Sequence, residues 1–162
     1  MSTLFSDLRI FQVAVVVHDL DAAAARHTAL LGSGPWRVYE FGPHMMQRYT
    51  MYGEPATART LLALNDSRPQ VEIIQPLSGP SIYQDWLDRR GDGLHHVGAL
   101  VESVDAVVEA AANQGIGVLS SGEAFGVGGS GKFAYLDSEG VLGTVLEVVE
   151  PPDGLGEPLR QL

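Results

Sequence analysis

The stretch FQVAVVVHDLDAAAARHTALLG, residues 11–32, decides the fold because its hydrophobic pattern changes halfway along. Its first part is apolar and β-branched, which is typical of a largely buried strand. Asp19 or Asp21 then caps an alanine-rich helix that ends at Gly32. The stretch therefore predicts a strand that leads directly into a helix.

The same layout returns in the second half of the chain. The stretch LHHVGALVESVDAVVEAAANQG, residues 94–115, again indicates a strand, a Ser103 cap and a helix that ends at Gly115. The offset that places Gln12 on His96 needs no gap across strand, cap and helix. This shared offset indicates an internal duplication of one strand–helix unit.

Short strand-like runs follow each helix, so each half is predicted to have the order βαβββ. The runs are 36–41, 47–52, 57–64 and 70–76 in the first half, and 116–120, 132–137 and 143–150 in the second. Runs of strands with one helix per half predict an α+β fold with mostly antiparallel sheets. The expected organisation is a first module at 1–78, a linker with a short helix from Ser81 at 79–93, a second module at 94–150 and a surface tail at 151–162.

The bulk composition argues against several classes of protein. A net charge of −10 disfavours nucleic acid, because phosphate binding needs clustered lysine and arginine. Cysteine is absent, which excludes disulfides, thiolate metal sites and cysteine nucleophiles. No apolar run reaches the roughly 18 residues that a membrane span needs. Asp7 and Arg9 stand where a signal peptide would be apolar, so we expect a cytoplasmic protein.

Four polar side chains interrupt strands that are otherwise apolar. Gln12 and His96 lie in the opening strands of the two halves, and Glu72 and Glu147 lie in the closing strands. Each has an ordinary explanation alone, since a glutamate can face solvent and a histidine can be a hydrogen-bonded core residue. A carboxylate inside an apolar strand is costly to bury unless it is paired or binds a metal. Together the four favour a nitrogen and oxygen shell for one divalent ion, such as Zn, Ni, Co, Mn, Fe or Mg.

Four motifs are spread along nearly the whole chain, namely FQVAVVVHDLDAA (11–23), VEIIQPLSGPS (71–81), GLHHVGALV (93–101) and FAYLDSEGVLGTVLEVVE (133–150). Together they resemble the vicinal oxygen chelate superfamily, which includes glyoxalase I, methylmalonyl-CoA epimerase, extradiol dioxygenases and bleomycin-resistance-type binding proteins. The match is best to the epimerase-like branch. This resemblance implies two βαβββ modules whose strands form a U-shaped, mixed and mostly antiparallel sheet around a cleft, often in a homodimer.

The resemblance also implies which residues bind the metal. The family's ligand positions fall on Gln12, Glu72, His96 and Glu147, and His95 is then expected to point to the opposite face of its strand. Gln12 stands where epimerases normally have histidine, but the same four residue types resemble the ligands of some glyoxalase I enzymes. The set differs from the two histidines and one carboxylate of an extradiol dioxygenase.

Such a site supports proton transfer on carbon next to a carbonyl group. The metal acts as a Lewis acid that stabilises an enolate or enediolate, and a carboxylate moves the proton. The resemblance gives Glu147 this second role, with Glu54 as a further catalytic carboxylate or simply a surface glutamate. The expected substrate is a small carbonyl compound or thioester. The competing interpretation is a metal-free protein that binds a small molecule between aromatic walls, which the Gln12 replacement favours.

A glycine-rich segment, Gly126 to Gly131 followed by Lys132, matches two phosphate-binding patterns by chance. A strand rather than a helix follows it, so neither pattern applies, and a mobile loop over the cleft mouth or a plain linker is predicted. Six aromatic residues could line a pocket or belong to the sheet core, the second being the expectation for most: Trp36, Tyr39, Phe41, Tyr49, Phe133 and Tyr135.

Overall fold

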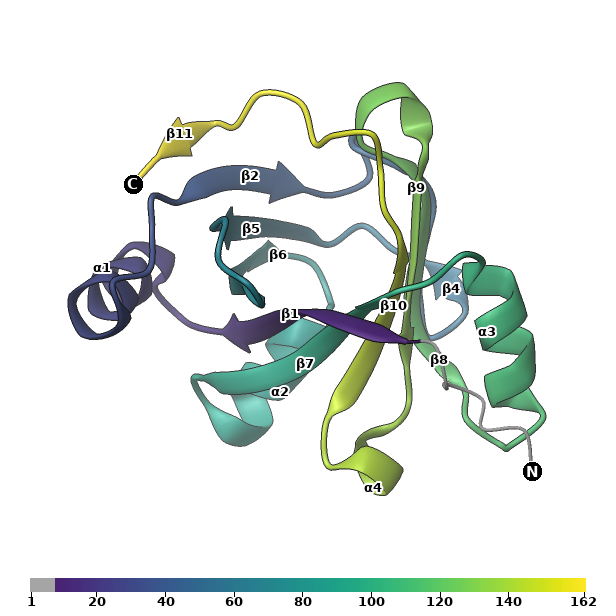
Figure 1. Ribbon diagram of the computed structural model, residues 1–162. Helices are drawn as coiled ribbons and strands as arrows, with labels where there is room; N and C mark the ends of the chain where they lie inside the picture. Colours follow the sequence, from purple (N-terminus) through teal and green to yellow (C-terminus); the bar gives the residue numbers. More distant parts are fainter. Residues whose placement is uncertain (1–7) are drawn as a thin grey trace.

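The computed structural model describes residues 8–162 (Figure 1). The first seven residues, which open the expected first module and include Asp7, lie outside this range. The strands are β1 (Arg9–Val16), β2 (Arg37–Phe41), β3 (Gln47–Met51), β4 (Glu54–Pro55), β5 (Arg59–Leu64), β6 (Gln70–Ser78), β7 (Gly93–Leu100), β8 (Val118–Phe125), β9 (Gly131–Leu136), β10 (Val145–Glu150) and β11 (Arg160–Gln161). The helices are α1 (Leu20–Leu31), α2 (Ile82–Arg90), α3 (Val104–Ala112) and α4 (Glu139–Leu142), with a 3-10 turn η1 (Val127–Gly129).

All the strands join one curled sheet in the order β11-β2-β5-β6-β1-β7-β10-β9-β8-β3-β4. At its centre the opening strands β1 and β7 of the two halves run antiparallel to each other. Each opening strand is parallel to the closing strand of its own half, β6 or β10, and every other pairing is antiparallel. The predicted α+β fold with a mixed, mostly antiparallel sheet is therefore confirmed.

Helices α1 and α3 cover the outer face of the sheet, one on each half (Figure 1). The side chain of Asp19 accepts a hydrogen bond from the backbone of Ala22, so Asp19 is the N-cap of α1, and Gly32 ends that helix with a φ of 66°. The Ser103 side chain caps α3 in the same way. Helix α3 ends at Ala112, somewhat before the expected Gly115. None of these helices, within residues 8–162, is long and apolar enough to cross a membrane.

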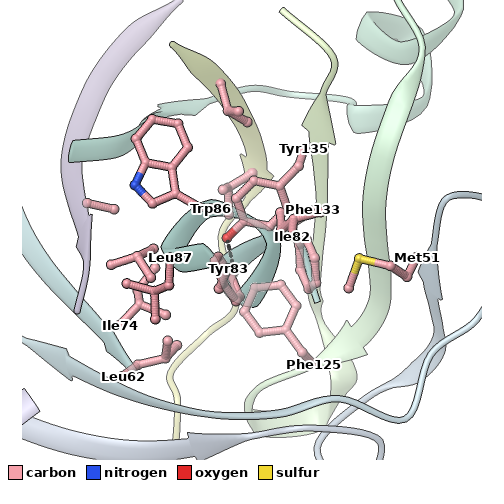
Figure 2. Packing of buried hydrophobic residues seen from close by; sticks show 14 of the residues in the cluster. Met51, Leu62, Ile74, Ile82, Tyr83, Trp86, Leu87, Phe125, Phe133 and Tyr135 are labelled. Carbon is pink, nitrogen blue, oxygen red and sulfur yellow. Dashed lines mark hydrogen bonds between the residues drawn. The ribbon is translucent and has the colours of Figure 1, made fainter. Parts of the chain in front are cut away.

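Helix α2 contributes to the core on the concave side of the sheet. The Ser81 side chain caps it, as expected. Its residues Tyr83 and Trp86 are buried and pack with Phe133 and Tyr135, which come from β9 (Figure 2). The concave core therefore contains residues from both halves, whereas the outer face has a separate core under each helix.

The second strand-like run of the first half, 47–52, has a role that the sequence did not reveal. Strands β2, β5 and β6 complete the first βαβββ module, and β3 leaves it to pair with β8 of the second module. The hydroxyl groups of Thr50 and Ser121 are 2.7 Å apart across this pairing. The β3–β4 hairpin thus joins the edge of the opposite half.

The C-terminal segment also links the two halves. It continues from β10, passes across the open side of the sheet and ends in β11, which lies beside β2 (Figure 1). The backbone groups of Trp36 and Leu162 exchange two hydrogen bonds of 2.9 and 3.0 Å, and Leu159 donates one to Val38. Within the segment 151–162, Arg160 and Gln161 therefore join the sheet as β11, while most of the segment is exposed.

Candidate functional site

The register of the central strands brings Gln12 and Glu147 to either side of one glycine. Gln12 on β1 and Glu147 on β10 are both paired with Gly98 on β7. A Cβ atom on Gly98 would lie 3.0 Å from Oε1 of Gln12, so glycine leaves the space between the two side chains open. Gln12 and Glu147 are both buried.

The neighbouring row of the sheet carries the other two predicted ligands. Glu72 on β6 and His96 on β7 are the partners of Ala14 on β1, on its two sides. Nε2 of His96 lies 3.3 Å from Oε2 of Glu72 and 3.3 Å from Oε2 of Glu147. The structure therefore brings together three of the predicted ligands in direct contact, and the register places Gln12 beside them.

Charge within this cluster favours a protonated imidazole in the metal-free protein. Burial of His96 opposes its positive charge, but the carboxylates of Glu147 and Glu72 outweigh that cost and raise its pKa to about 9. Burial raises the pKa of Glu72, and the charge of His96 acts in the opposite direction. The cluster thus carries one imidazolium against two buried carboxyl groups.

The second nitrogen of His96 contacts another imidazole. Nδ1 of His96 lies 2.9 Å from Nδ1 of His95. Burial, together with the charges of His96 and Arg89, lowers the pKa of His95 to about 2, so His95 is neutral and accepts this hydrogen bond. The hydrogen on Nδ1 of His96 is thereby fixed, and Nε2 is the nitrogen that faces the carboxylates.

The prediction that His95 points to the opposite face is wrong. The pairing of β1 with β7 jumps from Ala14–His96 to Val15–Leu94, which leaves His95 as the extra residue of a β-bulge. A bulge breaks the alternation of side chains on which the prediction depended. The His95 ring lies instead edge-on against Tyr83 and Trp86 of α2, at 5.2 Å from each ring centre.

A chain of amide hydrogen bonds orients Gln12. Its Nε2 donates to Oε1 of Gln70 at 2.8 Å, and Nε2 of Gln70 donates to the backbone carbonyl of Asn65 at 3.2 Å. These bonds occupy the NH₂ end of Gln12. The carbonyl oxygen, which is the end that can bind a cation, is left beside Gly98.

The donor atoms at this site fit a divalent cation. Among residues 8–162, Oε1 of Gln12, Oε2 of Glu72 and Nε2 of His96 are buried and make no hydrogen bond. Such buried atoms are costly unless something binds them, and amide, carboxylate and imidazole donors suit Zn, Ni, Co, Mn, Fe or Mg. In the same range no three His, Asp or Glu side chains stand in a ready-made metal geometry. Both carboxylates instead contact the imidazole, so binding requires loss of the proton from His96.

Gln12, Glu72 and Glu147 line a cleft of about 280 Å³, most of whose lining is apolar, whereas His96 lies outside this lining. Four of the six aromatic residues singled out above belong to it: Phe41, Tyr49, Phe133 and Tyr135. The Tyr83 hydroxyl, also in the lining, donates a 2.7 Å hydrogen bond to that of Tyr135 (Figure 2). Trp36 packs under α1 instead, and Tyr39 is buried outside the lining. The cleft therefore has aromatic walls and a polar floor, which Gln12, Glu72 and Glu147 form.

Glu54 is not brought to the cleft. It lies exposed on β4, the last strand at one edge of the sheet, and is absent from the lining.

The glycine-rich segment contacts the C-terminal segment, since the backbone of Val127 donates to that of Gly154 at 2.7 Å. A Cβ atom on Gly126 would lie 2.4 Å from Pro152, which explains glycine there. Pro152 and Leu155 line the cleft mouth.

The sequence analysis missed Gln70 and His95 as partners of the predicted ligands. Gln70 stands two residues before Glu72 on the same strand, so alternation could have placed both on one face. For His95 the sequence carried no such signal, because a bulge depends on pairing between distant strands.

The chain belongs to the glyoxalase/bleomycin resistance protein/dioxygenase superfamily, whose family model matches residues 11–135. An ethylmalonyl-CoA/methylmalonyl-CoA epimerase of Cereibacter sphaeroides is 30% identical over 116 residues, which cover 71% of this chain and 77% of the epimerase. The uncharacterised YqjC of Bacillus subtilis is 27% identical over 82 residues, which cover 51% of this chain. The matched residues span 58% of YqjC, which is less than two thirds of its length.

Solved structures of methylmalonyl-CoA epimerases share the fold. The enzyme of Mycobacterium tuberculosis has a TM-score of 0.63 at 21% identity, with 93% of this chain and 91% of that chain covered. A Streptomyces coelicolor epimerase in complex with 2-nitronate-propionyl-CoA has a TM-score of 0.65 at 20% identity, with 91% and 97% covered. At these identities the likeness extends to the fold alone.

Proposed function

We propose that this chain is a divalent-metal-dependent enzyme that transfers a proton on carbon next to the carbonyl group of a small substrate. Epimerases, isomerases and some lyases share this chemistry. The observation that carries the proposal is the set of three buried donor atoms without hydrogen bonds, on Gln12, Glu72 and His96. The relative named an epimerase supports the reaction class, since an epimerase inverts one stereocentre.

Four side chains would hold the metal: Gln12, Glu72, His96 and Glu147. Two carboxylates balance the charge of a divalent ion, and the amide oxygen and imidazole nitrogen add neutral donors. When bound, such an ion polarises a carbonyl oxygen and stabilises negative charge that develops there. Gln70 and His95 keep the amide oxygen and Nε2 pointed at the ion through their hydrogen bonds.

Glu147 is the proposed base. It lines the cleft and adjoins Gly98, so no side chain on that neighbouring position separates its carboxylate from an occupant. Its carboxylate accepts the proton from the carbon next to the carbonyl and returns it to the same or the adjacent carbon.

A metal-free binding protein is the second candidate. The observation in its favour is that the two carboxylates already surround the charge of His96 without a metal. Its cleft would hold a small apolar molecule between aromatic walls. It predicts binding without metal and without turnover.

Metal analysis of the purified and reconstituted protein separates the two candidates. We expect one equivalent of a divalent metal, lost in His96→Ala. In D₂O, the metal-loaded protein should catalyse exchange of the proton next to the carbonyl in a panel of α-hydroxycarbonyl and acyl-CoA compounds. Glu147→Gln should slow exchange by about 100-fold or more, as expected when a general base is removed. No metal after reconstitution would favour the binding protein.

Assembly as a homodimer and a cytoplasmic location are further proposals, which sedimentation and cell fractionation can test.

A further inference from the structure

We propose that the cleft selects a compact substrate with an uncharged, apolar body, in contrast to an acyl-CoA or a substrate with a second carboxylate. This inference rests on the proposed function, because a metal-binding carbonyl end must sit on the polar floor. It concerns the remainder of the molecule, which would lie among the side chains above that floor.

The lining has no positive charge to meet an anionic group. Neither lysine nor arginine lines the cleft, and residues 1–7, outside the described part, contain neither. In the metal-loaded site the ion would balance the charges of the two glutamates of the floor, so no net positive charge remains there, and the whole chain carries −10. An anionic group that enters this space loses its hydration without gaining a partner, which is costly.

Positive residues next to the lining are already paired with carboxylates. Only three lysines or arginines are chain neighbours of lining residues: Arg48, Arg59 and Lys132. Arg48 contacts Glu123, Arg59 donates to Glu40 at 2.7 Å, and Lys132 donates to both oxygens of Asp105 at 2.7 Å. Coenzyme A carries several phosphate charges, and these three cations would have to leave their partners to bind them.

The walls fit an aromatic or branched aliphatic group. Rings of Phe41, Phe125, Phe133 and Tyr135 contact one another in sequence, with ring centres 5.6 to 5.9 Å apart. Leu155 of the C-terminal segment faces them across the mouth. Each apolar group that leaves water here contributes to binding.

The size of the cleft sets an upper limit on what it encloses. Its volume is about 280 Å³. A dry cavity of about 150 Å³ holds benzene, so by proportion this cleft holds roughly a dozen non-hydrogen atoms. That is enough for an aromatic ring with a carbonyl and a neighbouring oxygen, whereas the nucleotide part of an acyl-CoA would have to lie outside the cleft.

Calorimetric titration of the metal-loaded protein with three hydroxamates tests the inference. Hydroxamates offer two adjacent oxygens to a metal and thus mimic an enediolate. We expect benzohydroxamate to bind at least about tenfold more tightly than acetohydroxamate, because its ring is buried. We expect 4-carboxybenzohydroxamate to bind at least about tenfold more weakly than benzohydroxamate, because its carboxylate meets no cation. Free coenzyme A should not compete.

A matched pair of variants links the selectivity to the lining. Leu155→Lys places an ammonium group at the mouth and should restore binding of 4-carboxybenzohydroxamate. Leu159→Lys on the same segment is the control, because Leu159 is 64% exposed and lies outside the lining, and it should leave the selectivity unchanged.

The outcomes separate the inference from the proposed function. If the protein takes up metal but binds the carboxylated compound as tightly as benzohydroxamate, or is inhibited by free coenzyme A, the inference is wrong and the proposed function stands. If no metal is taken up in the parallel metal analysis, the proposed function fails and the inference fails with it.

Discussion

Nδ1 of His95 and Nδ1 of His96 lie 2.9 Å apart within a β-bulge, so one imidazole determines which nitrogen of the other faces the carboxylates of Glu72 and Glu147. A metal-binding histidine commonly donates its second N–H to a carboxylate or a backbone carbonyl. In the proposed metal site a neutral histidine takes that place, and it accepts the bond without adding a negative charge beside the two carboxylates.

His95→Phe should weaken metal binding about 10- to 100-fold, the usual effect of removing an outer partner of a metal ligand. Phenylalanine keeps a ring against Tyr83 and Trp86 but accepts no hydrogen bond, so His96 can shift its hydrogen to the nitrogen that faces the two carboxylates. Metal affinity measured by calorimetry and the tautomer of His96 measured by ¹⁵N NMR are the readouts. His95→Asn retains an acceptor, and unchanged affinity in both variants would contradict the role of His95.

Gln70→Leu should lower metal affinity by about tenfold, again as expected for an outer partner. Without Oε1 of Gln70, the Gln12 amide is free to turn its NH₂ group toward the metal position. Gln70→Glu keeps an acceptor for Nε2 of Gln12 and should bind metal better than Gln70→Leu. Equal affinity in the two variants would show that Gln12 needs no such support.

Gly98→Ala should disturb the site with a modest cost to the fold. The added methyl group lies 3.0 Å from Oε1 of Gln12 and 3.1 Å from its Cβ, so the Gln12 side chain must move away from the metal position. We expect weaker metal binding and a loss of about 1–3 kcal/mol in the free energy of unfolding, as for other overpacked sites. Gly117→Ala is the control, since a Cβ there meets no atom within 4 Å. An alanine at position 98 that binds metal normally would rule out this account.

The stability of the metal-free protein should fall as the pH rises from about 6.5 to about 9. The pKa of His96 is about 9 in the folded protein, above the value near 6.5 of an unfolded histidine. Its stabilising contribution is therefore complete below 6.5 and is lost as the pH passes through 9. Urea unfolding in the presence of a chelator, at several pH values, measures this. His96→Gln should remove the dependence over this range, and a dependence that persists in that variant would have another origin.

Local sequence patterns were enough to predict the two strand–helix units. The side chains of Asp19, Ser81 and Ser103 cap helices as expected, because a cap involves residues only a few positions apart. The matching positions of Gln12 and His96 in the two repeats were visible for the same reason, since alternation along each strand follows from the local pattern.

Features that depend on contacts between distant segments were not predictable. The run that forms β3 has the composition of any short strand, and only the folded chain shows that it pairs with β8 of the other half. The bulge at His95 likewise arises from the pairing of β7 with β1. Glu54 was placed by resemblance alone, and it lies at an exposed edge because the β3–β4 hairpin carries it away from the cleft.

The path of the C-terminal segment separates the metal ligands from the enclosure of the cleft. Pro151, Pro152 and Leu155 form part of the cleft wall, although every proposed metal ligand precedes them in the chain. The segment ends in β11, which pairs with β2. Release of β11 from β2 would therefore open the cleft to ligands without removing any proposed metal ligand.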